Sequence, residues 1–393
     1  MRRLHTLEVC LIALSYPAWA QNAAPDPQAA SAAQTPATAQ AQTAAPAATP
    51  AAPPEKYPLT LGPVTFSGQI DAYFGLNFNH PSSDMNDLYN FDVRADRPDI
   101  NLAKITAQHD PDPLGFRFDL GFGKAFQIMH STETAPKFFD HVEQMFISFK
   151  PKQAKGFEAD FGQFVTSAGA EVIESKDNWN YSRSLLFAWA IPYYHFGLRT
   201  TMPVGKYFTG GFQLVNGWND LSDNNSGKTM GFTGNVATKK VTWSNTFYSG
   251  PENNNTTKGW REMYDTVLLL TPADKANFYI NYDYGHNAFP TGPAATWQGI
   301  AGAAHFQVNS WFALSPRAEW FSDANGFSTG TAQHLKEFTM TAEGKIARGL
   351  LARLEYREDW SDHSFFERGS TPGLHKNQGT VMLGLIAFME PKH

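Results

Sequence analysis

The stretch Val64–Phe78, VTFSGQIDAYFGLNF, alternates without a break between two kinds of residue. The even-numbered positions are apolar or small: Val64, Phe66, Gly68, Ile70, Ala72, Phe74, Leu76 and Phe78. The odd-numbered positions are mostly polar: Thr65, Ser67, Gln69, Asp71, Tyr73, Gly75 and Asn77. Because successive side chains of a β-strand point to opposite faces, this period of two predicts a strand with one apolar and one polar face.

The same alternation recurs at residues 114–122, 312–320 and 350–357. A soluble β-sandwich would show it too, so periodicity alone does not say whether the apolar face meets a protein core or lipid. Strand length is more decisive, because many of the segments reach the roughly 9 to 11 residues that a tilted membrane strand needs. Candidate strands begin near residues 64, 99, 114, 141, 157, 185, 207, 229, 241, 260, 276, 296, 312, 333, 350 and 378.

The connections between these strands alternate in length. The short ones are residues 110–113, 151–156, 201–206, 238–240, 272–275, 309–311 and 347–349. The long, polar ones are residues 80–98, 165–184, 219–228, 250–259, 322–332 and 361–377. Short turns at one rim, long loops at the other and an even strand number are typical of outer-membrane barrels. We therefore predict an all-β fold, a transmembrane antiparallel β-barrel of about sixteen strands with short periplasmic turns and long extracellular loops.

The composition excludes other membrane architectures. Only 17% of the 393 residues are charged and 14% are aromatic, whereas roughly a quarter of an ordinary soluble domain is charged. The longest uncharged apolar run, residues 184–198, is shorter than the ~20 residues of a spanning helix and contains Pro192. Residues 185–198 are apolar on both faces, so we expect a strand there with a bulge or an end near Pro192.

The N-terminal region predicts export. Residues 1–20 combine a basic start, an apolar segment and Ala18-Trp19-Ala20, as in a cleaved signal peptide. Residues 21–56 are rich in Ala and Pro and predict a disordered linker, which leaves residues 57–393 for the barrel. Cleavage removes the only cysteine, Cys10, together with two of the 31 basic and one of the 37 acidic residues. The remaining chain then has 29 basic and 36 acidic residues and a formal net charge of −7. This negative charge argues against a nucleic-acid partner.

One stretch resembles a known family. Residues 162–199, GQFVTSAGAEVIESKDNWNYSRSLLFAWAIPYYHFGLR, followed by Asn216-Gly217-Trp218 and by residues 223–229, DNNSGKT, are similar to the β-barrel porins described as OmpL-like. The resemblance extends over residues 60–390 and implies a bacterial outer-membrane channel, without a set of functional residues to carry over. The chain departs from the usual ending of such barrels, because five residues follow Phe388.

A barrel of about sixteen strands encloses a lumen wide enough for water, so its function lies in its lining. The charges that alternation places on the inner face are Asp71, Arg117, Asp119, Arg317, Glu319, Arg353, Glu355 and Arg357. Both signs occur, and opposed charges across a lumen orient polar solutes and tune ion selectivity. The alternative is that Arg353, Glu355 and Arg357 only pair with neighbours and stiffen the wall.

The long loop Val165–Ser184 is the candidate for a constriction folded into the lumen. It combines Glu171, Glu174, Lys176, Asp177 and Arg183 with the aromatic residues Trp179 and Tyr181. Inward folding of this loop is an analogy with general porins. An outside loop with an ordinary solvated charge run is the alternative.

Enzymatic and metal sites find little support. Residues 326–330, GFSTG, match G-x-S-x-G, with Asp323 and His334 nearby, but a strand rather than a helix is predicted to follow. The histidines are scattered, with His195 and His305 inside predicted strands, and the acidic run Asp84–Asp87 lacks the spacing of a calcium loop. We expect neither catalysis nor a cofactor nor a bound metal.

The sequence as a whole favours a passive porin in the bacterial outer membrane, surrounded by lipid and permeable to small hydrophilic solutes. A non-conducting surface barrel that binds a ligand or partner through its long loops is the alternative, and a lipid hydrolase at the rim is a third. Whether copies of the chain form a homo-oligomer is left open.

Overall fold

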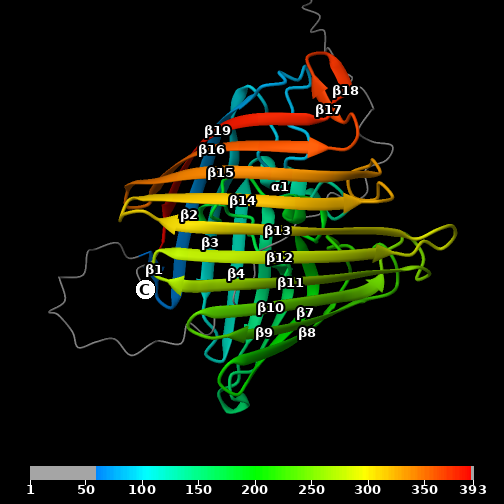
Figure 1. Ribbon diagram of the computed structural model, residues 1–393. Helices are drawn as coiled ribbons and strands as arrows, with labels where there is room; N and C mark the ends of the chain where they lie inside the picture. The colour runs from blue at the N-terminus through cyan, green and yellow to red at the C-terminus, as the bar shows by residue number, and fades with distance from the viewer. Residues whose placement is uncertain (1–58, 391–393) are drawn as a thin grey trace, which may run out of the picture.

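The computed structural model describes residues 59–390, and the predicted signal peptide and linker lie outside them. Sixteen long strands, β2 to β16 and β19, form one closed antiparallel barrel (Figure 1). The first eight are β2 (Val64–Asn77), β3 (Arg97–His109), β4 (Leu114–Phe122), β5 (Val142–Phe149), β6 (Glu158–Val165), β7 (Tyr194–Val204), β8 (Phe208–Val215) and β9 (Thr229–Ala237). The other eight are β10 (Val241–Pro251), β11 (Trp260–Ala273), β12 (Ala276–Asn287), β13 (Ala295–Gln307), β14 (Phe312–Asp323), β15 (Gln333–Ala347), β16 (Leu350–Ser361) and β19 (Asn377–Met389).

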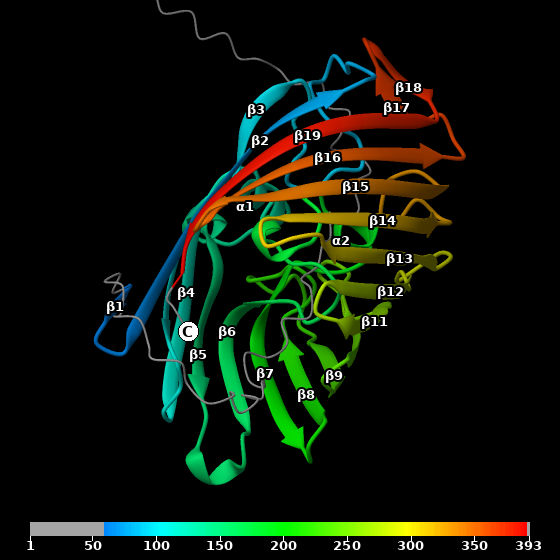
Figure 2. The same cartoon turned by 60° about the vertical axis from the view of Figure 1, so that its left-hand side comes forward.

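The smaller elements lie in the connections. They are β1 (Thr60–Leu61), α1 (Lys124–Met129), η1 (Lys137–His141), η2 (Lys152–Ala154), η3 (Ser175–Asp177), α2 (Leu185–Trp189), β17 (Phe366–Arg368) and β18 (Thr371–His375). The β17–β18 hairpin stands beyond the end of β16 and β19 in two views of the barrel (Figures 1 and 2). Within the described residues, no helix is long and apolar enough to cross a membrane.

Each barrel strand pairs with its neighbours in the chain, and the ring closes between the last strand and the first. β19 pairs with β2 from Thr380↔Asn77 to Met389↔Gly68. Closure leaves no row of unpaired backbone groups at an edge, which is the condition for a sheet to survive in lipid. The predicted all-β barrel of about sixteen strands is therefore confirmed, with short turns at one end and long loops at the other.

The two faces of the barrel differ as the alternation predicts. On β2 the side chains of Ile70 and Phe74 are 56% and 46% exposed on the outside, whereas Asp71 and Asn77 are fully buried inside. The outer face is apolar along most strands, as a lipid-facing surface must be. The inner face carries the polar and charged residues, so the site is inside the barrel.

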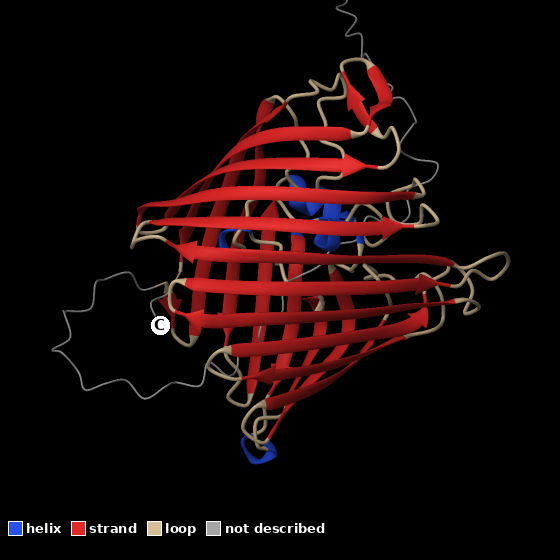
Figure 3. Ribbon diagram, viewed as in Figure 1, coloured by secondary structure: helices blue, strands red, loops and turns tan. Residues whose placement is uncertain are grey.

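The predicted strand start near residue 185 is wrong. Residues 185–189 form helix α2, and β7 begins only at Tyr194, two residues after Pro192. Ser184 is the N-cap of this helix, and its hydroxyl accepts a hydrogen bond from the Phe187 amide at 2.9 Å. The segment is apolar on all sides because it lies within the barrel (Figure 3), where every face of the helix is covered. The other predicted starts fall within two residues of the observed ones.

An apolar core fills part of the lumen towards the long loops. Helix α2 contributes Leu186 and Phe187, the loop between β2 and β3 contributes Phe91, and inner-face residues such as Trp297 and Phe321 complete the core. Phe91 packs edge-on against Phe187 at 5.6 Å between ring centroids. The long loops are thus packed into the barrel and do not simply extend into solvent.

Candidate functional site: the barrel interior

The connection between β6 and β7, residues 166–193, folds into the lumen, and we call it the inner loop. It includes the segment Val165–Ser184 singled out from the sequence, apart from Val165, which ends β6. Most of its residues are buried, and its tip reaches the short-turn end of the barrel, where Lys176 pairs with Glu390 at 2.5 Å. The structure therefore places this segment inside the barrel and against its wall.

Arg353 on β16 holds the backbone of the inner loop. Its guanidinium donates hydrogen bonds to the carbonyl oxygens of Ser175, Asn178 and Asn180, with the last two at 2.6 and 3.0 Å. The same guanidinium pairs with Glu343 of β15 at 2.7 Å. One buried side chain thus satisfies three loop carbonyl groups that would otherwise be costly to bury.

Carboxylates on the same wall accept from loop amides. Glu355 accepts from the backbone N–H groups of Tyr181 and Ser182 at 2.6 and 2.9 Å. Glu319 accepts from those of Leu185 and Leu186, the first turn of α2, at 3.0 and 3.2 Å. A carboxylate at a helix N-terminus satisfies unpaired N–H groups and interacts favourably with the helix dipole.

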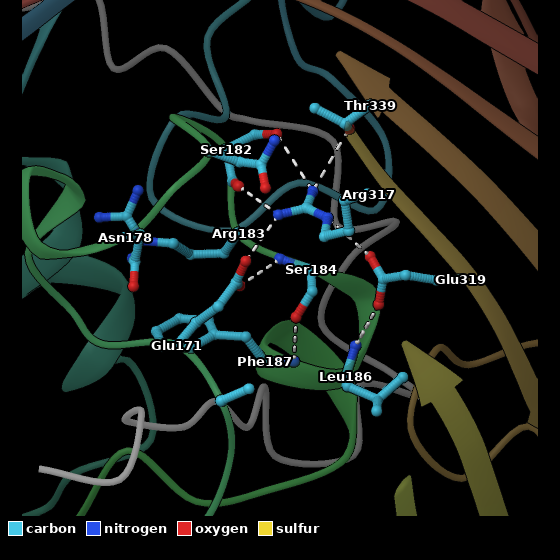
Figure 4. A network of polar contacts seen from close by, with 12 residues as sticks. Glu171, Asn178, Ser182, Arg183, Ser184, Leu186, Phe187, Arg317, Glu319 and Thr339 are labelled. Atoms are coloured by element: carbon cyan, nitrogen blue, oxygen red, sulfur yellow. Dashed lines mark hydrogen bonds and ion pairs between the residues drawn. The ribbon is translucent and has the colours of Figure 1, made fainter. Parts of the chain in front are cut away.

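Arg317 on β14 links the wall to two parts of the loop, before and after its tip (Figure 4). It pairs with Glu171 at 2.7 Å and donates to the Ser182 carbonyl oxygen at 2.8 Å. Glu171 in turn accepts from the Ser184 N–H at 2.7 Å. Arg357 donates to the Arg183 carbonyl oxygen at 2.7 Å and pairs with Asp359 at 2.8 Å.

Strands β2 and β19 complete this contact surface. Asp71 accepts from the Tyr181 hydroxyl at 2.7 Å and from the Ser175 hydroxyl at 2.5 Å. The Tyr181 ring lies against Gly384 of β19, where a Cβ atom would collide with it. We call the inner faces of β14–β16, β19 and β2, with the loop backbone bound to them, the latched sector.

A buried cluster anchors Glu174 of the inner loop. The Lys104 ammonium pairs with Glu174 and, at 2.9 Å, with Glu143, while Asp119 lies 3.9 Å away. Burial alone would raise the pKa of Glu174, but the Lys104 ammonium lowers it to about 2. The carboxylate is therefore ionised and bound at neutral pH.

The two remaining charged residues singled out in the loop differ from each other. Arg183 is buried, donates to the Tyr181 carbonyl oxygen at 2.5 Å and lies over the Phe91 ring at 5.5 Å. Asp177 is half exposed and pairs with Lys176 at 2.8 Å. Burial raises the pKa of Asp177 despite that ammonium.

A cavity of about 410 Å³ lies on the other side of the lumen, towards the short turns of β3–β10. Three cations line it, each paired with a carboxylate: Arg117 with the buried Asp119 at 3.0 Å, Arg199 with Asp160 at 2.7 Å, and Lys150 with Glu158 at 2.9 Å. Hydroxyl groups of β7–β9 line it as well, from Thr201, Thr209 and Thr233. We call this cavity and its lining the open sector.

The start of the inner loop borders the open sector at Ser167. Ser167 donates its backbone N–H to the Tyr248 hydroxyl at 3.3 Å, and its carbonyl oxygen accepts from the Thr246 hydroxyl at 2.9 Å. The Gln213 amide donates to the Ser167 hydroxyl at 2.9 Å. A ring of hydrogen bonds from β8 and β10 thus holds the start of the loop beside the cavity.

The structure separates the inner-face charges found from the sequence into two sets. Asp71, Arg317, Glu319, Arg353, Glu355 and Arg357 bind the inner loop, while Arg117 faces the cavity and Asp119 lies buried behind it. Arg199, Asp160, Lys150 and Glu158 of the open sector were missed. Their strands alternate less regularly, and Gly162 and Gly197 interrupt the pattern at a φ of +139° and +155°.

The G-x-S-x-G segment is a turn. Asp323 accepts from the backbone N–H groups of Phe327, Ser328 and Thr329 at 2.6 to 2.9 Å. His334 stacks on Trp320 at 6.1 Å between ring centroids. The carboxylate thus caps the turn, and β15 follows it as the sequence predicts.

The comparisons agree with this architecture. Residues 63–389 match the family described as "Putative beta-barrel porin-2, OmpL-like", so the chain belongs to this family of outer-membrane porins. Among curated proteins, none matches the sequence.

Solved porins share the fold at low sequence identity. The anion-selective porin from Comamonas acidovorans is 10% identical with a TM-score of 0.55, covering 83% of this chain and 99% of that one. OmpF of Salmonella typhi, solved as a complex with daunomycin, is 11% identical with a TM-score of 0.55, covering 83% and 97%. OmpT of Vibrio cholerae in a trimer form is 13% identical with a TM-score of 0.53, covering 83% and 99%.

Proposed function

We propose that the chain lets small hydrophilic solutes diffuse across the bacterial outer membrane, and that they pass along the open sector of its lumen. The cavity of about 410 Å³ inside the barrel, lined by charged and hydroxyl groups, carries the proposal. The inner loop would act as a fixed partition, because its backbone is bound to the latched sector by buried charged groups. Solute size would then be limited by the space between this loop and the wall of β4–β10.

A non-conducting barrel is the second candidate. The apolar core around α2 and the ring of hydrogen bonds at Ser167 favour it, because both obstruct the lumen on the long-loop side of the cavity. In that case the long loops would bind a ligand or partner at the cell surface.

Single-channel conductance of the purified full chain in a planar bilayer tests the two candidates. We expect stable openings, and we expect Thr233→Trp, which fills the cavity, to lower their conductance. The matched control is Phe232→Trp on the same strand, since Phe232 is 49% exposed and faces outwards. A folded and inserted barrel that never conducts would rule out diffusion and favour the second candidate.

Lipid contact and self-assembly belong to the same proposal. The apolar outer face fits outer-membrane lipid, and the Vibrio cholerae neighbour solved as a trimer supports a homo-oligomer. Light scattering of the detergent-solubilised chain measures its mass. A mass of one chain would contradict the oligomer without affecting the conduction proposal.

A further inference from the structure

The open sector brings two kinds of binding group to one cavity: guanidinium groups with donors to spare and a set of threonine hydroxyls. We propose that this cavity binds the anion of a small hydroxylated carboxylic acid, of the sugar-acid class. The proposal deepens the proposed function by naming a solute class, and it rests on that function only for the passage of the solute.

The guanidinium groups are only partly used by the protein. Among the described residues, Arg117 bonds Asp119 through Nε alone, and Arg199 bonds Asp160 through Nε and Nη2. Both Nη atoms of Arg117 and Nη1 of Arg199 therefore remain as donors at the cavity wall. Guanidinium groups bind carboxylates through paired, charge-assisted hydrogen bonds, so these free donors suit a carboxylate ligand.

The two arginines lie near one inner-face residue, Phe146. Arg117 is the cross-strand partner of Phe146, and the Arg199 guanidinium lies 5.4 Å from the centre of the Phe146 ring. Arg199 of β7 therefore reaches across β6 towards β5, and both arginines have Phe146 as a neighbour. A small carboxylate above this ring would meet donors from both sides.

The exposure of the ion pairs favours an anion. Arg117 is 23% exposed and its partner Asp119 is 0% exposed, while Arg199 and Asp160 are 18% and 9% exposed. Lys150 and Glu158 follow the same order, at 29% and 19%. A solute in the cavity thus meets the three cations before the carboxylates paired with them, although Asp110, an exposed carboxylate, also lines the cavity.

The threonine hydroxyls can bind the hydroxyl groups of the ligand. Within residues 59–390, the hydroxyls of Thr201, Thr209 and Thr233 make no hydrogen bond, although all three line the cavity. Each hydroxyl can donate one hydrogen bond and accept two, as the hydroxyls of a sugar acid can. The cavity volume of about 410 Å³ lies within the ~300 to 1,000 Å³ of small-molecule sites.

Titration calorimetry of the full chain in detergent micelles tests the proposal with three probes. Gluconate carries both a carboxylate and hydroxyls, glucose lacks the charge, and acetate lacks the hydroxyl-bearing chain. We expect gluconate to bind at least tenfold more tightly than either control probe. Equal affinities for gluconate and glucose, or no binding of gluconate, would overturn the assignment.

Variants then test separately whether the arginines and the threonines of the cavity bind the ligand. Gluconate affinity should fall at least tenfold in the Arg117→Gln/Arg199→Gln double variant and should not change in Lys239→Gln, an exposed turn residue outside the cavity. Thr209→Val/Thr233→Val should weaken gluconate several-fold and leave acetate unaffected, whereas Thr242→Val, outside the cavity, changes neither. Unchanged gluconate binding in the arginine double variant would contradict the proposal. Should that variant fail to fold, Arg117→Lys, which keeps the charge but loses the forked donors, replaces it.

Binding and conduction fail separately in this design. A barrel that binds gluconate but never conducts retains the site and contradicts the proposed function. A barrel that conducts without binding gluconate contradicts the site alone.

Discussion

The latched and open sectors contain the same residue types on the same inner face, but these residues have different partners. Three arginines of the latched sector are fully buried: Arg317, Arg353 and Arg357. Their guanidinium groups donate hydrogen bonds to the inner loop and to neighbouring carboxylates. In the open sector, Arg117 and Arg199 pair with one carboxylate each and remain partly exposed. An inward-pointing arginine is thus structural where a loop reaches it and available to solute where none does.

This difference has an energetic meaning. A buried charge whose partner is removed costs several kcal/mol, whereas an exposed ion pair contributes about 0 to 1 kcal/mol. Substitutions in the latched sector should therefore change stability and the position of the loop. Substitutions at the more exposed pair of the open sector, Lys150 and Glu158, should change selectivity with little effect on stability.

The largest effect is expected for Arg353→Met. The change removes the donors to three loop carbonyl groups and leaves Glu343 without its guanidinium partner. We expect the free energy of unfolding in urea to fall by about 3 to 5 kcal/mol and the inner loop to become sensitive to protease.

Lys275→Met, in the exposed turn between β11 and β12, is the matched control and should leave both properties unchanged. Wild-type protease resistance of the loop in Arg353→Met would show that the latch does not depend on this side chain. Conductance measured on the same variant reports whether releasing the loop widens the path.

The strands could be predicted from the sequence, but the separation of the two sectors could not. Alternation depends on neighbouring residues, so Asp71, Arg317 and Arg353 could be placed on the inner face from the sequence alone. Their partners in the inner loop lie more than a hundred residues away in the chain: hydroxyl groups of Ser175 and Tyr181 for Asp71, and carbonyl groups for the two arginines, as for Arg353 and Ser175. No local pattern encodes such a contact.

Helix α2 shows the same limit. Residues 185–189 are apolar all round, which fits a strand buried on both faces and a buried helix equally well. Ser184 is the residue that could have favoured the helix, because serine is a preferred N-cap and Pro192 excludes a continuous strand. The segment forms a helix rather than a strand because it lies inside the lumen, and the sequence does not reveal that position.

The next effect is a pH dependence at the edge of the latched sector. Asp92, in the loop between β2 and β3, is fully buried, and burial raises its pKa to about 7 despite the nearby Arg183. A carboxyl whose pKa is higher in the folded state than its usual 3.8 adds stability below pH 4, and that contribution is lost as pH rises through 7. We expect Asp92→Asn to stabilise the barrel at pH 8 by up to about 4 kcal/mol and to flatten its pH profile.

Urea unfolding of wild type and Asp92→Asn at pH 4 and pH 8 measures this difference. Asp96→Asn is the control in the same loop, since Asp96 is exposed and already bonded to His80. Equal stabilities of wild type and Asp92→Asn at pH 8 would contradict the prediction.

A smaller effect is expected at the start of α2. Ser184→Ala removes the hydroxyl that accepts from the Phe187 N–H. Loss of such a cap costs about 1 kcal/mol, so the urea midpoint should fall slightly while conductance and ion selectivity stay the same. Ser184→Asp retains an acceptor and should recover most of the stability, and a selectivity change in Ser184→Ala would place the residue nearer the solute path than the structure does.

The smallest change in stability is expected in the open sector, for Lys150→Gln. Lys150 and Glu158 are 29% and 19% exposed, so breaking their pair should change the free energy of unfolding by less than about 1 kcal/mol. The cavity loses one positive charge, and the ion selectivity of the channel should shift towards cations, measured as the reversal potential in a salt gradient. Lys239→Gln removes the same charge from a turn outside the cavity and should leave the reversal potential unchanged. A shift of equal size in both variants would mean that the total charge of the short-turn rim, and not the open sector, controls selectivity.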